Sequence, residues 1–328
     1  MKHRLITVAA LALIVAACSE QPEIPHYAMG DWAEYVNPLA GTLSTFNLST
    51  GNTYPAIAVP WGAHFWTPQT GKNGDGWTYR YDATHIRGFK QTHQPSPWIN
   101  DYGAFSIMPV TTGPYYDEEQ RASWFSHKTE VAKPYYYSVY LADHDVTAEM
   151  VPTSHAAWFR FTYPESEKSY LVVDAFQGGR VEVVDNHTIR AYAVNNHGGV
   201  ASNFCNYILI KCDTPFQVEN SPAQYALVSF PTAKGQEVQV KVASSFIDME
   251  QARLNLGEVN DPFDEVKMYS QTEWNQVLGK IEVEDDDLDH LRTFYTCLYR
   301  SLLFPRDLSE IGMFGLLQHY SPHSGEVE

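Results

Sequence analysis

The sequence contains few cysteines, and their positions do not suggest a cross-linked fold. Only four occur in the 328 residues. Cys18 lies near the N-terminus, whereas Cys205 and Cys212 bracket a run of residues that is typical of one extended strand. Such a strand spans about 23 Å, far beyond the reach of a disulfide bond. We therefore expect Cys205, Cys212 and Cys297 to be free or buried thiols, with neither a disulfide framework nor a zinc site.

Basic residues are also scarce. Lysine and arginine together number 22, against 39 aspartates and glutamates, which gives a net charge of −17. This balance argues against a nucleic-acid partner, because phosphates require a basic surface. After the first 20 residues, no segment is apolar enough to span a membrane. Hydrophobic residues still make up 44% of the chain, enough for a sizeable core, and its length predicts about two domains.

The N-terminus has the pattern of a processed leader. A short basic stretch precedes an apolar run at residues 5–17, which is too short for a membrane-spanning helix. The following Val-Ala-Ala-Cys18 resembles a bacterial lipobox, although an ordinary signal peptide with an incidental cysteine is the alternative. We predict a signal peptide at 1–17 and a tether at 18–30, lipidated at Cys18. The mature protein would then contact the bacterial outer membrane only through its lipid anchor, facing the periplasm or the cell surface.

From about residue 35 to 243, short apolar or alternating runs recur between glycine, proline and asparagine turns. Many strands at short spacing without intervening helices predict a mainly β fold, a large antiparallel β-sandwich at 31–247. Clear examples of these predicted strands are residues 135–141, 156–162, 170–174, 188–194, 206–211, 226–230 and 237–242.

The sequence period then becomes helical. We predict a linker at 248–283 with helices at 248–256 and 261–278, the second with Asp261 as N-cap and Pro262 as its first residue. The acidic run at 284–287 lacks the alternation and glycine of a calcium loop, so we interpret it as a helix N-terminus. An apolar stripe over 288–303 follows and predicts a helix in need of a partner. Residues 284–328 would thus start an incomplete helical domain.

One loop, at residues 92–103, combines aromatic and polar groups without a regular period. It contains His93, Trp98, Asn100 and Asp101 within nine residues. An indole face beside a carboxylate and an amide suits a sugar, whose apolar ring face stacks on the indole while its hydroxyls bind the polar groups. The competing interpretation places the tryptophan in the sandwich core and uses the aspartate to cap a turn.

Several longer stretches resemble glycoside hydrolase family 92. The resemblance covers nearly all of the predicted mature chain, with Ala40 and Ala56 as departures where the family often carries a bulkier aliphatic residue and a glycine. The matching stretches are residues 36–42, 51–55, 59–62, 88–103, 244–248, 251–256, 294–299 and 303–306.

This resemblance implies a calcium-dependent, inverting exo-α-mannosidase acting on mannose-containing glycans. Its fold would be a β-sandwich packed on an (α/α)6 barrel, with the active site between them. The resemblance places the catalytic carboxylates and most Ca²⁺ ligands beyond Glu328, in a missing C-terminal helical domain, so that no catalytic or metal-binding residue is expected in this chain. The residues expected to bind the sugar are Trp98, Asp101, Asn100, His93, Trp61 and Gly62.

Other outcomes stay open at this stage. We expect α-1,2 linkages first, but the family resemblance does not fix whether α-1,2, α-1,3 or α-1,6 linkages are cut. If the protein ended at residue 328, it would be a catalytically inactive surface lipoprotein that binds carbohydrate. A purely structural surface lipoprotein would share the fold and the anchor but would leave the loop with Trp98 and Asp101 unexplained.

Overall fold

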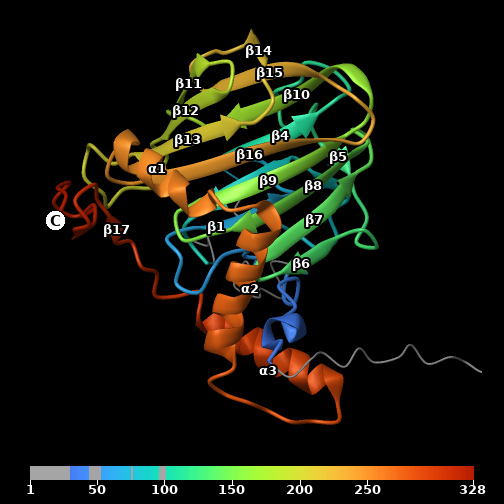
Figure 1. The fold of residues 1–328 in the computed structure, drawn as a ribbon, viewed down its shortest axis with the longest axis vertical. Coiled ribbons are helices and arrows are strands. Elements are labelled where there is room, and N and C mark those ends of the chain that lie inside the picture. Colours follow the sequence, from blue (N-terminus) through green and yellow to red (C-terminus); the bar gives the residue numbers. More distant parts are fainter. Residues whose placement is uncertain (1–29, 44–52, 75–76, 96–100) are drawn as a thin grey trace, which may run out of the picture.

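The structure, a computed structural model, describes residues 30–43, 53–74, 77–95 and 101–328 (Figure 1). It is mainly β, as predicted, with two large antiparallel sheets packed face to face and helices following them in the chain. The predicted leader with Cys18 lies outside the described residues, as do Trp98 and Asn100.

The first sheet has six strands in the order β1-β3-β4-β10-β15-β14. Every residue of β1, β3 and β4 is buried, so this half of the sheet is covered on both faces. The strands are β1 (Phe65–Gln69), β3 (Gly88–Thr92), β4 (Phe105–Val110), β10 (Ser166–Asp174), β15 (Tyr225–Thr232) and β14 (Gln217–Asn220).

The second sheet has eight strands in the order β11-β12-β13-β16-β9-β8-β7-β6. Burial alternates along much of β16 and β8, as expected for strands with one face on a core. Its strands are β11 (Arg180–Asp185), β12 (Thr188–Ala193), β13 (Asn206–Cys212), β16 (Gln236–Ser245), β9 (Ala156–Tyr163), β8 (Val146–Pro152), β7 (Tyr136–Leu141) and β6 (Val131–Lys133).

Two separate two-stranded sheets are formed by β2 (His85–Ile86) with β5 (Ser123–Trp124) and by β17 (Glu310–Ile311) with β18 (Leu317–Gln318). The predicted thiols are free: Cys205 and Cys212 are buried, and Cys297 is exposed.

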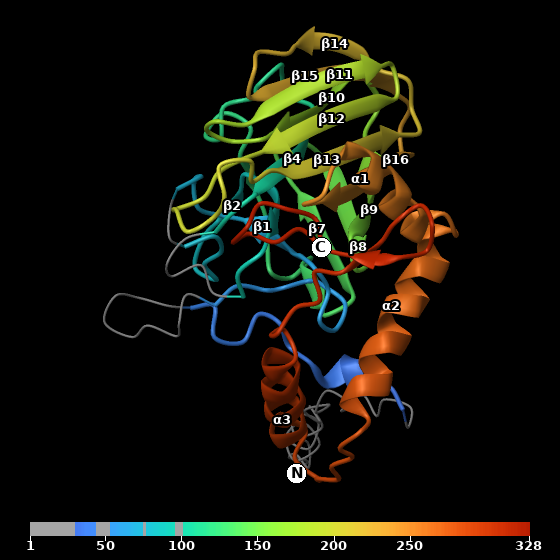
Figure 2. The ribbon, with the colours of Figure 1, turned by 90° about the vertical axis from the view of Figure 1, so that its left-hand side faces the viewer.

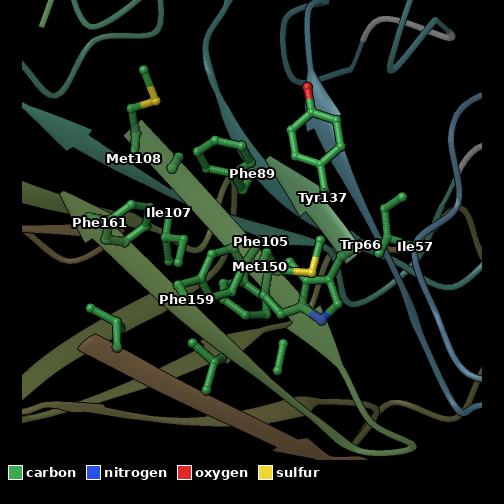
Figure 3. Close-up of a cluster of buried hydrophobic side chains, with 14 of the residues drawn as sticks. Ile57, Trp66, Phe89, Phe105, Ile107, Met108, Tyr137, Met150, Phe159 and Phe161 are labelled. Carbon is green, nitrogen blue, oxygen red and sulfur yellow. The ribbon is translucent and has the colours of Figure 1, made fainter. Parts of the chain in front are cut away.

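Aromatic side chains from both sheets fill the space between them (Figure 3). Trp66 of β1 is fully buried and meets Phe159 of β9 edge-on, with 4.9 Å between ring centroids. Phe105 of β4 approaches the same indole at 5.5 Å. Large aromatic surfaces removed from water supply much of the stability of such a core. Trp66 therefore lies at the packing centre that joins the two sheets.

The three α-helices occur where the sequence pattern predicts them: α1 (Met249–Asn255), α2 (Phe263–Leu278) and α3 (Leu288–Ser301). Two 3-10 turns that were not predicted accompany them, η1 (Trp32–Tyr35) and η3 (Leu256–Val259). Asp287 caps α3 by accepting the Asp289 N–H, which confirms that the acidic run starts a helix. One prediction was wrong by a residue: Pro262 is the N-cap of α2 and not its first residue. Within the described residues, no helix is long and apolar enough to cross a membrane.

The apolar stripe of α3 is less exposed than the sequence predicts. Tyr295, Tyr299 and Leu303 are buried, and Leu291, Phe294, Leu298 and Leu302 pack partly buried against the main core. Trp32 and Tyr35 of η1 both stack on Tyr295, with centroid distances of 5.6 and 5.5 Å. The partner that the stripe was predicted to need is supplied in part by the N-terminal turn η1, which stacks on Tyr295.

The segment after α3 runs back along the sandwich to the region of α1 (Figure 1 and Figure 2). Its buried Glu310 accepts hydrogen bonds from Ser245 Oγ at 2.9 Å and Asn255 Nδ2 at 2.6 Å. A second polar contact, which is partly exposed, joins His155 Nδ1 to Glu258 of η3 at 2.8 Å. We call the Glu310 cluster and the His155–Glu258 pair the polar anchors, because they fix the helical segment to the sheets.

Candidate functional site

Asp101 lies between the end of β3 and the start of β4, and only one of its two carboxylate oxygens has a hydrogen-bond partner among the described residues. Oδ1 accepts the backbone N–H groups of His93 and Tyr102, both at 2.9 Å. Oδ2 is buried and has no hydrogen-bond partner among the described residues. Burial raises the pKa of the Asp101 carboxyl, while the nearby Lys90 ammonium and the two N–H groups oppose that shift. The site thus presents one free acceptor oxygen in a fixed position.

His93 is hydrogen-bonded to both Asp101 and Tyr102. Its ring is buried, stacks on Tyr102 with centroids 5.3 Å apart, and packs on Phe246 at 4.9 Å. Nδ1 lies 2.7 Å from the Tyr102 carbonyl oxygen, so it carries the proton and donates. Burial, reinforced by the Arg306 charge, holds the pKa of His93 well below its usual range. A neutral imidazole in this position orients the Asp101 segment.

Arg306 belongs to the segment after α3 and contacts the site through Ala63 and Tyr102. Its Nη1 donates to the Ala63 carbonyl at 2.9 Å, and its Nη2 donates to the Tyr102 hydroxyl. Its Nε is buried without a partner among the described residues. Through the Tyr102 hydroxyl the guanidinium is tied to the residue that directly follows Asp101, and its charge adds to the effects that lower the pKa of the Asp101 carboxyl. One unpaired donor and one unpaired acceptor therefore occur at the same site.

The turn at Trp61 and Gly62 is held by the same C-terminal segment. The Asp307 N–H donates to the Trp61 carbonyl at 2.8 Å. Trp61 has a φ of 56°, a left-handed conformation that is costly for a bulky side chain. At Gly62, an added Cβ would lie 3.0 Å from Val59 Cγ2, so the turn has little room for a side chain. Backbone strain of this kind is often kept where a residue must hold a functional position.

A buried polar network lies beneath the loop and connects the matching sequence stretches. Gln91 Nε2 lies 3.1 Å from His64 Nδ1 and donates to Ser244 Oγ at 3.0 Å. Asn206 Nδ2 donates both to Gln91 Oε1 at 2.8 Å and to the Gly103 carbonyl at 2.7 Å. Burial, with His155 nearby, lowers the pKa of His64 to about 3, so its ring is neutral at ordinary pH. The network fixes β3, β13 and β16 relative to the loop.

The structure thus brings four of the six predicted sugar-binding residues to one region. Asp101 and His93 are directly bonded, while Trp61 and Gly62 are joined to them through Arg306 and its neighbour. Trp98 and Asn100 stay predictions, since they lie outside the described residues. The sequence analysis assigned no role to Arg306, although it lies in one of the matching stretches. The family resemblance therefore includes Arg306, but only the fold shows that its guanidinium donates hydrogen bonds to Ala63 and Tyr102.

Two cavities differ in their relation to this region. A cavity of about 280 Å³ has Gln94 and Tyr102 in its wall and therefore adjoins the Asp101 loop. A larger one of about 500 Å³ lies between the η1 region and α3, and none of the predicted sugar-binding residues lines it. The smaller cavity is the one that belongs to the candidate site.

Metal ligands do not converge here. In the part of the chain that the structure describes, no three histidine, cysteine, aspartate or glutamate side chains are grouped so that they could hold a metal ion.

Comparison with protein families gives two adjacent matches. The family model described as the glycosyl hydrolase family 92 N-terminal domain matches residues 35–245. The model of the glycosyl hydrolase family 92 catalytic domain matches residues 251–328. A curated relative is a protein of Arthroderma benhamiae described as an uncharacterized secreted glycosidase, 23% identical over 90% of this chain and 44% of that protein.

Solved structures show the same similarity. An inverting mannosidase of family 92 from Bacteroides thetaiotaomicron is 41% identical and superposes with a TM-score of 0.87 over 92% of this chain. A family 92 α-mannosidase from the same organism is 26% identical, with a TM-score of 0.76 over 89% of the chain. This chain spans 44% of the length of each of these two proteins.

Proposed function

The chain belongs to glycoside hydrolase family 92, and on that premise we propose that it is the sugar-shaping part of an inverting exo-α-mannosidase. The enzyme would remove terminal mannose from mannose-rich glycans. The observation that carries the proposal is the buried, unpaired Oδ2 of Asp101 beside Arg306. The mannosidase activity of two structurally similar proteins supports the choice of sugar.

In this proposal, Asp101 binds the terminal sugar and does not react with it. A sugar hydroxyl would donate to Oδ2, while the backbone N–H groups already hold Oδ1. A hydrogen bond to an ionised acceptor contributes about 1.5–3 kcal/mol, so one such contact can position a sugar strongly. Trp98 would stack on the apolar face of the ring, and Asn100 would bind a second hydroxyl, as the sequence analysis expects. His93 and Arg306 would keep Asp101 in place.

Inverting hydrolysis needs two further carboxyl groups. One protonates the leaving glycosidic oxygen, and the other activates a water on the opposite face, at a separation of roughly 6.5–9.5 Å. We assign neither role to a residue of this chain, because Oδ1 of Asp101 is already bound by two backbone N–H groups and the proposal uses its Oδ2 to bind the sugar. The proposal places both groups in the remainder of the family's catalytic domain. This chain then supplies binding and orientation, which lower the barrier by fixing the reacting geometry.

We expect calcium to bind only in the full-length enzyme. When bound, it would supply positive charge that helps orient and polarise the sugar. Its ligands would come mostly from outside this chain, since the described residues do not group as a metal site. No step assigned to this chain depends on it.

The cellular location of the enzyme and the glycosidic linkage that it cleaves are also proposals. Lipidation of Cys18 would tether the enzyme to the outer membrane of a bacterial cell, and a secreted relative is compatible with a location outside the cytoplasm. Cleavage of α-1,2 linkages is the first expectation, to be compared directly with α-1,3 and α-1,6 substrates.

The experiment that tests the proposed function changes Asp101 in the full-length enzyme. Asp101→Ala should lower kcat/KM for an α-mannoside by about 10- to 100-fold, the loss of about 1.5–3 kcal/mol of binding in the transition state. Asp101→Asn, which keeps the shape of the side chain, should lose less. The matched control is Asp264→Asn, whose carboxylate is 79% exposed on α2. Unchanged kinetics in Asp101→Ala would remove this residue from the sugar site.

A further inference from the structure

A cavity of about 400 Å³ lies on the outer face of the second sheet, beside α1. Leu209 and Lys211 of β13 line it, whereas Ile208 and Ile210, which alternate with them along the strand, belong to the core between the sheets. Helix α1 packs on β13 and β16 and supplies another wall (Figure 1). We call this space the outer cavity, because it opens on the solvent side of the sheet.

The outer cavity is separate from the candidate sugar site. Asn206 begins β13 and donates to the Gly103 carbonyl beside the Asp101 loop. Lys211 lies five residues further along the same strand, a distance of about 17 Å, and its side chain leaves the opposite face of the sheet. None of the four predicted sugar-binding residues that the structure describes lines the outer cavity. A ligand bound there would therefore not touch the terminal sugar.

Three basic side chains line the outer cavity, although the chain has a net charge of −17. Arg190 is exposed on β12, and within the described residues its guanidinium has no hydrogen-bond or ion-pair partner. Lys211 Nζ donates to Thr188 Oγ1 at 2.6 Å, which leaves two of its three N–H groups for a ligand. Arg253 adds a second guanidinium from α1. Positive charge is thus concentrated at one place on an acidic surface.

The two acidic side chains that line the outer cavity are already bound within the protein. Asp185 accepts the His187 N–H through Oδ1 at 2.8 Å and the Thr188 hydroxyl through Oδ2 at 3.0 Å. Both carboxylate oxygens of Glu250 accept hydrogen bonds from Arg253, at distances of 2.6 to 3.0 Å. The hydrogen-bonding groups still free to meet a ligand are therefore mainly positively charged donors, and these suit an anion.

The rest of the lining is aliphatic. Leu209 forms a buried part of the wall at 5% exposure, Val184 is 47% exposed, and Met249 of α1 is half-buried. None of the residues that line the outer cavity is aromatic, so it has no ring on which a nucleobase could stack. These features suit a small ligand with an anionic group on a compact, non-aromatic body.

We propose that the outer cavity is a second ligand site, which binds a phosphate monoester carried on a sugar. A phosphate group has several acceptor oxygens and about two negative charges, so cations from β12, β13 and α1 can bind it together. Arg190 and Lys211 bind the phosphate, Arg253 supplies a remaining N–H group, and the sugar ring rests on Leu209 and Met249. No bond is broken at this site, and the inference goes beyond the proposed function.

The test measures binding to the full-length enzyme by calorimetry. Glucose 6-phosphate is the probe, because a glucose derivative keeps the mannose site out of the measurement. We expect a Kd of about 0.1–1 mM, which Arg190→Gln raises about tenfold, the effect of losing one charge-assisted hydrogen bond. Glucose, which lacks the phosphate, and inorganic phosphate, which lacks the sugar, should each bind at least about tenfold more weakly than the probe.

The matched control is Arg292→Gln, which removes a partly exposed guanidinium from α3 and should leave the Kd unchanged. A thermal melt shows whether Arg190→Gln is folded, and Lys211→Gln replaces it if it is not. No binding of the probe at about 10 mM, an unchanged Kd in the folded variant, or inorganic phosphate bound as tightly as the probe would each overturn the proposal.

A kinetic measurement checks that the two sites are separate. Arg190→Gln should keep kcat/KM for an α-mannoside within about twofold of the wild-type value, and a larger loss would overturn the assignment of a second site. The calorimetric result does not depend on catalysis. Failure of the proposed mannosidase activity and failure of this inference are therefore distinguishable.

Discussion

The β-sandwich and the segment after α3 are held in place by different kinds of contact. The sandwich buries aromatic and aliphatic side chains between its sheets, with Trp66 fully enclosed. The later segment is fixed by Arg306 and Glu310, while six of its large apolar side chains are between 63% and 86% exposed. These are Phe304, Ile311, Met313, Phe314, Leu316 and Leu317.

The difference separates stability from positioning. Apolar burial is non-directional and stabilises whatever arrangement packs well. A buried hydrogen bond contributes a smaller net free energy but accepts only one geometry, because an unmade bond leaves a costly unpaired group. The sandwich thus gives the molecule its stability, whereas the polar anchors and Arg306 decide where the Asp101 loop faces.

The largest loss of stability is expected from a substitution in the apolar core of the sandwich. Trp66→Ala removes the side chain that joins the two sheets and should lower the free energy of unfolding by about 3–5 kcal/mol. Chemical denaturation of the chain, followed by far-ultraviolet circular dichroism, measures this loss. A loss below about 1 kcal/mol would mean that Trp66 is not the packing centre.

A smaller, pH-dependent effect is expected from the polar anchors. The desolvation of His155 is outweighed by Glu258, so the pKa of His155 is raised, and the pKa of Glu258 is lowered in turn. The stabilisation from His155 is fully present below its unfolded pKa of about 6.5 and is lost as the pH rises through the higher folded value. Glu258 contributes only above its unfolded pKa of about 4.3, and its part is lost as the pH falls through the folded value.

The measurement compares the wild-type chain with His155→Gln at several pH values, so that the other histidines cancel. The wild-type advantage should be about 1 kcal/mol between pH 5 and 6 and should shrink as the pH is raised above 7. An advantage that grew with rising pH would show that His155 is neutral in the folded protein.

The smallest stability effect is expected in the exposed hairpin, where association should change instead. Phe314 is 86% exposed, so Phe314→Ser should alter the free energy of unfolding by no more than about 0.5 kcal/mol. It should also reduce self-association of the chain, measurable by light scattering, because exposed apolar patches drive association. A stability loss above 1 kcal/mol would show that the ring is packed in solution.

Much of the fold could be predicted because its signals are local. The runs at 156–162 and 237–242 alternate or are continuously apolar, and they form β9 and β16. Asp248 and Asp287 cap α1 and α3 because a short acidic side chain can accept the first free N–H groups of a helix. The partner of the apolar stripe on α3 could not be identified from local signals, because η1 lies more than 250 residues earlier.

In the candidate site, too, the residues with local signals could be predicted and those with distant contacts could not. Asp101 and His93 were predicted from one loop, since eight residues separate them and their types suit a sugar. Nothing in the sequence around Arg306 indicates that its guanidinium contacts Ala63 and Tyr102. That contact depends on the path of the chain after α3, which is set by Glu310 and its partners and not by any pattern near residue 306.

Arg306 also sets an order of events during synthesis. Its hydrogen bonds span 243 residues to Ala63 and 204 residues to Tyr102. Strands β1 to β16 can pair before residue 306 is made, because domains generally fold as units from the N-terminus. The sandwich would therefore exist first, with the Asp101 loop still lacking its guanidinium clamp. A sugar site of this design matures only after the helical segment has been synthesised.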